Sequence, residues 1–233
     1  MGVVFTFPGQ GAQRAGMIAE LPDSAAVRDT LAETADVLGR DVSTLDNSDA
    51  LEGTETTQLA LTVVGVASAR HLIAEAGMPD AAMGLSIGAW PAAVIAGAIG
   101  YADALILVAA RGRLMAEAYP QSYGMSAVIG LDEDRVQELA ADLYSDDAPL
   151  YVGNVNSDTQ IVVAGRDDAL DRLAEAATAK GASRVQRLDM AVPSHCALLD
   201  VPAERLAEAA AGTTFYAPAC AYFSANRRRR LWQ

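Results

Sequence analysis

The stretch Met83-Gly84-Leu85-Ser86-Ile87-Gly88-Ala89-Trp90 decides the fold. It contains the pattern Gly-x-Ser-x-Gly, which is typical of a serine on a sharp turn from a strand into a helix. Gly84 and Gly88 have no side chain, so the strand and the helix can cross closely and Ser86 can take a strained backbone conformation. Its hydroxyl then lies at the N-terminus of the helix, where backbone N–H groups favour negative charge. The stretch therefore predicts an α/β fold with Ser86 as a nucleophile.

The residues on either side of this turn support the prediction. Residues 81–85 are mostly apolar, as a short buried strand is, and residues 89–98 are rich in alanine and helical in character. The pattern predicts a strand, the serine turn and a helix in direct succession.

The composition indicates a globular protein with a sizeable core, because 52% of the 233 residues are hydrophobic and 20% are charged. A net charge of −13 argues against a nucleic-acid partner. With Cys196 and Cys220 as the two cysteines, we expect neither a disulfide framework nor a metal site. We identify no apolar run long enough to cross a membrane and no basic signal-peptide segment in residues 1–5, so we expect a cytoplasmic protein without a membrane partner.

Two groups of elements follow from the periodicity of apolar residues. The first group surrounds the serine turn and comprises a strand at 3–7, helices at 24–38, 57–76, 101–118 and 202–211, and a strand that begins near 220. The second group has the order strand, helix, strand, strand, helix, strand, at 125–130, 132–143, 150–154, 160–164, 167–179 and 183–190.

The second order is that of a ferredoxin-like (βαββαβ) unit. We therefore expect a ferredoxin-like subdomain at 124–190 and a large α/β-hydrolase-like domain with a short parallel sheet at 1–123 and 191–233. The basic run at 227–230 is expected to be a solvated chain end, and the alternative is a docking patch for an acidic partner.

A serine nucleophile needs a general base to take its proton. The chain has two histidines, and we favour His195 because it lies in a short Pro-Ser-His-Cys loop, where catalytic residues are commonly presented. A loop histidine without a catalytic role is the alternative. His71, late in the helix at 57–76, is expected to be a polar residue near a helix end. The sequence marks no acidic residue as the third member of a catalytic triad with Ser86 and His195. A backbone carbonyl or an amide is therefore expected to orient the imidazole of His195.

An acyl intermediate on Ser86 also needs donors for its oxyanion. The N–H of Ile87 is the natural first donor, and Gln10 in the loop at 8–13 is the natural second, although that loop by itself is compatible with an ordinary strand-to-helix turn. Arg111 follows an apolar helical run and is expected to face inward, where it needs an anionic partner. That partner is either a carboxylate of the protein or a substrate carboxylate held by two hydrogen bonds.

Four motifs, taken together in their order along the chain, carry a family resemblance. They are Phe7-Pro8-Gly9-Gln10-Gly11-Ala12-Gln13, Gly84-Leu85-Ser86-Ile87-Gly88, Arg111-Gly112 and Val192-Pro193-Ser194-His195-Cys196. Together they resemble the malonyl-CoA:acyl-carrier-protein transacylase family over essentially the whole chain. The resemblance implies that Ser86 is acylated with His195 as its base. It also implies that Gln10 and the Ile87 N–H form the oxyanion hole and that Arg111 pairs with the free carboxylate of malonate. Leu85 and Ser194, next to the catalytic pair, are expected to contact the substrate.

Within this family the chain looks closest to the epsilon subunit of malonate decarboxylase. Leu85 stands where the fatty-acid-synthesis enzymes usually have histidine, and Ala89 stands where they have an acidic residue. The resemblance implies malonyl-CoA as donor, the CoA-derived thiol of an acyl carrier protein as acceptor, other decarboxylase subunits as partners, and no permanently bound cofactor. The alternative is a malonyl-CoA transacylase of fatty acid or polyketide synthesis. Two further alternatives are a serine esterase or thioesterase and a non-catalytic docking subunit.

Family members continue past Tyr222-Phe223-Ser224 through a further segment of the large domain. In the family, that segment supplies the backbone carbonyl that orients the catalytic histidine. We therefore expect the large domain to be truncated at its C-terminus.

Overall fold

A short sheet of mainly parallel strands carries the serine turn. The computed structural model describes residues 2–119, 121–190, 192–225 and 229–231. In this part of the chain the first sheet has the order β1 (Val4–Phe7), β2 (Ala81–Gly84), β7 (Ala221–Ser224) and β8 (Arg229–Leu231). β1, β2 and β7 are parallel, and β8 is antiparallel to β7. Phe7 pairs with Gly84, so the carboxyl ends of β1 and β2 lie at the same edge of the sheet.

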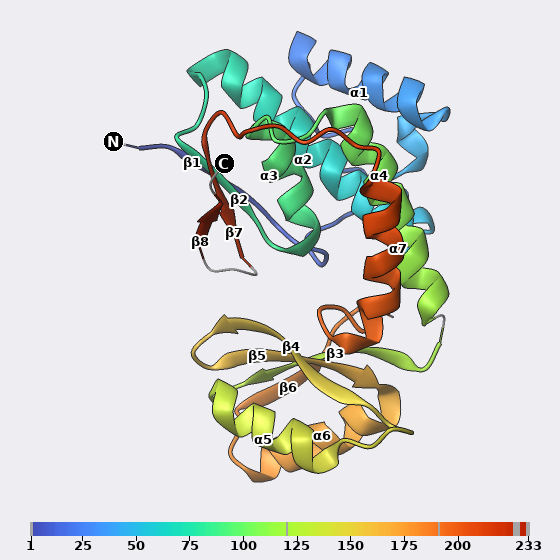
Figure 1. The fold of residues 1–233 in the computed structure, drawn as a ribbon, viewed down its shortest axis with the longest axis vertical. Helices are drawn as coiled ribbons and strands as arrows, with labels where there is room; N and C mark the ends of the chain where they lie inside the picture. Colours follow the sequence, from blue (N-terminus) through green and yellow to red (C-terminus); the bar gives the residue numbers. More distant parts are fainter. Residues whose placement is uncertain (1, 120, 191, 226–228, 232–233) are drawn as a thin grey trace. The chain divides into compact units, whose positions relative to one another are not determined.

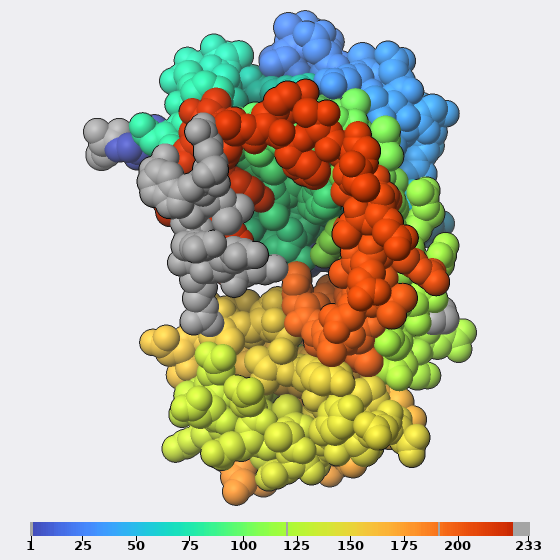
Figure 2. All heavy atoms as spheres, viewed as in Figure 1, coloured from blue at the N-terminus to red at the C-terminus, as the bar shows by residue number. Residues whose placement is uncertain are grey.

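Helices α2 and α3 cover one face of this sheet (Figure 1). The described helices before β3 and after β6 are α1 (Ala25–Leu38), α2 (Thr54–Ala76), α3 (Ala89–Ile95), α4 (Tyr101–Ala118) and α7 (Asp200–Ala210), with short 3-10 turns η1 (Val42–Thr44), η2 (Ala50–Glu52), η3 (Ser86–Gly88) and η4 (Ala197–Leu199). α1 begins where the Ser24 side chain accepts a hydrogen bond from the N–H of Val27 and ends at Gly39, whose φ of 62° is left-handed. α1 packs on α2 and lies at the surface of its unit, in blue in Figure 2.

Helix α2 is long and apolar enough to cross a membrane by length and composition alone. The expectation that no apolar run has this length is therefore wrong. Leu59, Val63 and Val66 are nevertheless fully buried in a protein core, and the helix packs against α1 and α3. A core helix of a globular protein passes the same test of length and composition, and α2 serves here as such a core helix.

A second, antiparallel sheet has the strand order β4-β5-β3-β6. Its strands and helices, in chain order, are β3 (Tyr123–Ile129), α5 (Glu133–Leu143), β4 (Leu150–Ser157), β5 (Gln160–Arg166), α6 (Asp167–Ala179) and β6 (Arg184–Arg187). Apolar side chains of α5 and α6 form one core with those of the sheet. Both this order and this pairing are those of the predicted βαββαβ unit, so the expected fold class is confirmed.

The chain divides into two compact units, which are residues 1–113 with 206–233 and residues 114–205. The second unit contains the whole of the predicted subdomain at 124–190 together with chain on both sides of it. Its limits fall inside α4 and α7. The predicted subdomain boundaries themselves stay a prediction.

Three predicted elements differ from the structure. The helix expected at 89–98 ends at Ile95, because Gly97 takes a left-handed φ of 74°. The strand expected at 183–190 spans only Arg184–Arg187. In the basic run at 227–230, which was expected to be a solvated chain end, residues 229 and 230 pair with β7 as part of strand β8, whereas residues 227 and 228 lie outside the described residues. The solvent exposure of this run stays a prediction.

Candidate active site

The turn between β2 and α3 holds Ser86 in a strained conformation. Its φ of 51° lies in the left-handed region that side chains other than glycine rarely adopt. A Cβ atom on Gly84 would lie 2.0 Å from the carbonyl oxygen of Gly88, and one on Gly88 would lie 2.3 Å from the carbonyl oxygen of Phe7. Both glycines are therefore required by close backbone contacts. The Tyr222 hydroxyl on β7 donates to the carbonyl of Ala89 at 3.1 Å and ties α3 to the sheet.

The Gln10 loop lies directly beside this turn. It follows β1, whose end is paired with the end of β2, and the N–H of Leu85 donates to the carbonyl of Phe7 at 3.0 Å. A Cβ on Gly9 would lie 3.1 Å from the carbonyl oxygen of Leu85, so the two backbones nearly touch. The N–H of Gly11 donates to the Gln13 side chain at 2.6 Å, which fixes the loop. The structure thus places the two predicted oxyanion donors, Gln10 and Ile87, on adjoining segments of one unit.

Arg111 reaches the serine from helix α4. Its Nη2 donates to Ser86 Oγ at 3.3 Å. Its Nη1 is buried and has no hydrogen-bond partner among the described residues. Burial lowers the pKa of Arg111 to about 10, so the guanidinium is still protonated at neutral pH. The prediction that Arg111 faces inward agrees with this geometry, and within the described chain no protein carboxylate forms an ion pair with it.

The loop that carries His195 belongs to the second unit. His195 has a left-handed φ of 64°, the second strained position among the predicted site residues. The loop passes close to β4, since a Cβ on Gly153 would lie 2.9 Å from the carbonyl oxygen of Ser194. Within the loop, Ser194 Oγ donates to the carbonyl of Val192 and Cys196 Sγ donates to that of Pro193, both at 3.4 Å. Burial also raises the pKa of the Cys196 thiol.

Ser86 and His195 thus lie in different units, and their pairing as nucleophile and base stays a prediction. The contact roles predicted for Leu85, which is 45% exposed, and for the buried Ser194 also stay predictions. His71 lies on α2 in the first unit, where its Nδ1 is buried without a hydrogen-bond partner among the described residues.

Gln58, a polar side chain of α2 that is 1% exposed, was not identified from the sequence. A single polar residue inside an apolar helix forms no motif, so only the fold reveals that it is buried. Among the described residues, no cluster of three or more histidine, cysteine or acidic side chains has a geometry that could hold a metal ion.

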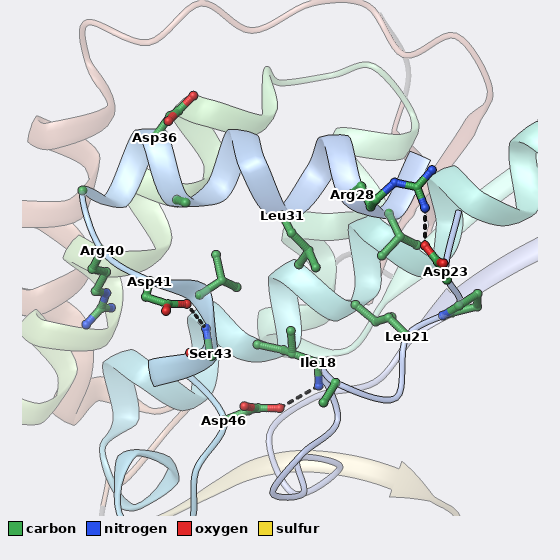
Figure 3. Close-up of a pocket in the computed structure, with 16 residues that line it drawn as sticks. Ile18, Leu21, Asp23, Arg28, Leu31, Asp36, Arg40, Asp41, Ser43 and Asp46 are labelled. Carbon is green, nitrogen blue, oxygen red and sulfur yellow. Dashed lines mark hydrogen bonds and ion pairs between the residues drawn. The ribbon is translucent and has the colours of Figure 1, made fainter. Parts of the chain in front are cut away.

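A separate groove of about 830 Å³ lies between α1 and two other segments, at residues 18–23 and 39–46 (Figure 3). Apolar side chains such as Leu31 point into it. Two of its carboxylates already accept hydrogen bonds from the backbone: Asp46 accepts from the N–H of Ile18 at 2.7 Å, and Asp41 accepts from the N–H of Ser43 at 2.9 Å. None of the predicted site residues lines this groove.

Comparisons with known proteins agree with this fold and this turn. The acyl transferase domain family matches residues 4–229. The malonyl CoA-acyl carrier protein transacylase of Salmonella typhimurium is 40% identical over 220 residues, which are 92% of this chain and 71% of that protein.

Two solved structures are similar over the whole fold. The malonyl CoA-acyl carrier protein transacylase of Coxiella burnetii matches with a TM-score of 0.90 and 34% identity, over 95% of this chain and 72% of that chain. A malonyl-transacylase solved in complex with its type II PKS acyl-carrier protein matches with a TM-score of 0.93 and 35% identity, over 100% of this chain and 77% of that chain. The chain therefore belongs to the acyl transferase domain family, among the malonyl CoA-acyl carrier protein transacylases.

Proposed function

We propose that this chain transfers a malonyl group from malonyl-CoA, through a malonyl ester of Ser86, to the thiol of an acyl carrier protein. The observation that carries the proposal is the guanidinium of Arg111, which contacts Ser86 Oγ at 3.3 Å and keeps a buried Nη1 without a partner among the described residues. A buried cation with an unused donor beside the nucleophile suits an acyl group that ends in a carboxylate.

The chemistry has two balanced halves. In the first, Ser86 Oγ attacks the thioester carbonyl, His195 takes the hydroxyl proton, and the CoA thiolate leaves and is protonated by the imidazolium. In the second, the carrier thiol gives its proton to His195 and attacks the serine ester, and the Ser86 oxygen leaves and recovers the proton. In both halves the N–H of Ile87 and a donor from Gln10 stabilise the oxyanion.

Selection of malonyl over acetyl follows from the same guanidinium. Malonate supplies a carboxylate that pairs with Nη1 of Arg111, whereas an acetyl group leaves that buried donor without a partner. A site built to bind a charged group rejects an analogue that lacks it, because the unpaired group is costly.

The relatives reported above favour one kind of carrier. They are named as malonyl CoA-acyl carrier protein transacylases, and one was solved with a type II PKS acyl-carrier protein. We therefore favour an acyl carrier protein of fatty acid or polyketide synthesis as the acceptor over the carrier of malonate decarboxylase. The decarboxylase assignment, which Leu85 and Ala89 suggested, stays a prediction, as does a cytoplasmic location.

Covalent labelling tests the proposed function. The chain is incubated with malonyl-CoA, and the adduct is measured by intact-protein mass spectrometry and assigned by peptide mapping. We expect a malonyl adduct on Ser86 that disappears in Ser86→Ala and is transferred when an acyl carrier protein with its thiol arm is added. An adduct that persists in Ser86→Ala would contradict the proposal, and release of malonate to water at one rate with or without the carrier would favour a hydrolase.

The two histidines provide a matched pair of variants. His195→Ala is expected to slow Ser86 acylation by about 10²- to 10⁴-fold, the usual contribution of a general base. His71→Ala is expected to leave it within about twofold, because this residue has no role in the proposed chemistry. Equal losses in both variants would show that the base is assigned wrongly. Transfer to a decarboxylase carrier, compared with a fatty-acid-synthesis carrier, decides between the two acceptors.

A further inference from the structure

Helix α4 approaches the first turn of α2 unusually closely at the residue after Arg111. A Cβ atom on Gly112 would lie 2.4 Å from the Cα of Glu55 and 3.0 Å from its backbone nitrogen. These are backbone atoms, so a side chain at position 112 would push the two helices apart. Glycine is also unfavourable inside a helix, and Gly112 lies well inside α4, so its presence there needs a packing reason. The close approach supplies that reason.

The same turn of α2 is firmly held and reaches the serine. The Thr57 hydroxyl is fully buried and donates to the carbonyl of Leu51 at 2.7 Å, which ties the start of α2 to η2. Helix α2 also packs against η3, the turn that begins at Ser86. One helix therefore contacts both the backbone beside Arg111 and the turn that carries the nucleophile.

We propose that Gly112 and the backbone of Glu55 are positioning residues that set the distance between the Arg111 guanidinium and Ser86, and thereby the preference for malonyl over acetyl. This inference rests on the proposed function. The Arg111 Nη2 to Ser86 Oγ distance of 3.3 Å leaves little room for change, because a hydrogen bond is lost only a few tenths of an ångström beyond it. Any outward shift of α4 at residue 112 moves Arg111 with it.

The contact between backbones, rather than the ion pair beside it, is the part that positions Arg111. Arg113 and Glu55 form an ion pair at 3.5 Å, but the Arg113 side chain is 56% exposed. Exposed pairs of this kind contribute little to geometry or stability. Loss of the Arg113 charge is therefore expected to leave the approach of α4 to α2 unchanged.

The test compares initial rates of Ser86 acylation by malonyl-CoA and by acetyl-CoA. In Gly112→Ala we expect the malonyl-to-acetyl ratio to fall by about tenfold or more, with acetyl acylation within about twofold of the parent, because misplacement of a binding group by about 1 Å costs up to 10²-fold. Gly212→Ala is the matched control, since a Cβ there meets nothing within 4 Å, and it should keep the parent ratio. In an Arg111→Ala background, Gly112→Ala should not change the ratio further.

A second pair of variants decides the matter if Gly112→Ala does not fold. Thr57→Val removes the hydroxyl that holds the Glu55 turn, and Thr62→Val removes an equally buried hydroxyl of α2 that donates to the carbonyl of Gln58 at 2.8 Å. We expect the ratio to fall by about threefold in Thr57→Val, the size of one modest hydrogen bond, and to stay at the parent value in Thr62→Val.

The possible outcomes separate the two proposals. A parent protein that forms no malonyl-serine overturns the proposed function and this inference with it. The positioning role alone is overturned if the parent protein forms malonyl-serine and folded Gly112→Ala keeps the parent's malonyl-to-acetyl ratio. If Gly112→Ala does not fold, the same result in Thr57→Val overturns it. An equal fall of both rates in Gly112→Ala also overturns it, because a general loss of structure does not distinguish malonyl from acetyl.

Discussion

Replacement of Arg111 by alanine gives the sharpest test of how the site selects its acyl group. The substitution removes the donor to Ser86 Oγ and the buried Nη1 that has no partner among the described residues. The malonyl group should lose the guanidinium that pairs with its carboxylate, whereas the acetyl group has no carboxylate and loses no such partner. Acylation by malonyl-CoA and acylation by acetyl-CoA should therefore respond differently to this one substitution.

The size of the effect follows from this geometry. A hydrogen bond to a charged group contributes about 1.5–3 kcal/mol, and truncation of one partner of a buried charge pair costs about 2–5 kcal/mol. With Arg111 buried and protonated at neutral pH, we take about 3 kcal/mol for the loss. Since about 1.4 kcal/mol corresponds to a factor of ten, malonyl acylation should slow by roughly a hundredfold.

The assay supplies both donors at equal concentration and counts malonyl and acetyl adducts on Ser86 by intact mass at early times. Acetyl acylation should stay equal or rise, because the variant no longer leaves a buried guanidinium unpaired. Arg113→Ala is the matched control, an exposed arginine two residues later on the same helix, and it should keep the parent ratio. An unchanged malonyl-to-acetyl ratio in Arg111→Ala would refute the role of this residue.

Three further outcomes are expected. Gly88→Ala should lower the free energy of unfolding by about 3 kcal/mol or be recovered unfolded, because its Cβ would lie 2.3 Å from a backbone carbonyl oxygen, whereas a Gly212→Ala control should unfold in urea like the parent. Tyr101→Phe should cost about 1 kcal/mol in the same assay, since the Tyr101 hydroxyl bonds Thr34 Oγ1 at 2.7 Å in a buried site; no measurable change would contradict this. The malonyl-to-acetyl ratio should be constant between about pH 6 and pH 9, because the pKa of Arg111 stays near 10, and a fall within that range would show that another group controls selectivity.

Much of the fold could be predicted because its local signals agree with one another. The spacing of apolar residues predicts a helix at 24–38, and the structure has α1 at Ala25–Leu38, capped by Ser24 and Gly39. The alternation of strands and helices after Gly124 leads to one sheet order, which the structure shows. Helix α3 was predicted too long, because alanines continue past Ile95 and the left-handed φ of Gly97 leaves no mark in the composition.

The site was predictable only in part. The serine turn follows from two glycines at fixed spacing, and the inward direction of Arg111 follows from the apolar run before it. The contact between Gly112 and Glu55 joins two helices far apart in the sequence, and no local pattern indicates it. Whether Arg111 meets a protein carboxylate or a substrate carboxylate was likewise open in the sequence, since ion pairs form between distant positions.

The division of the chain into two units has a consequence for how such an enzyme can change over time. Residues 1–113 carry the proposed nucleophile and the arginine proposed to recognise the acyl group, whereas residues 114–205 carry the proposed base. Mutations that retune the acyl group can therefore accumulate in one unit while the proton-transfer residue in the other stays intact. An enzyme lineage could in this way come to accept a different acyl group without first losing its ability to form the serine ester.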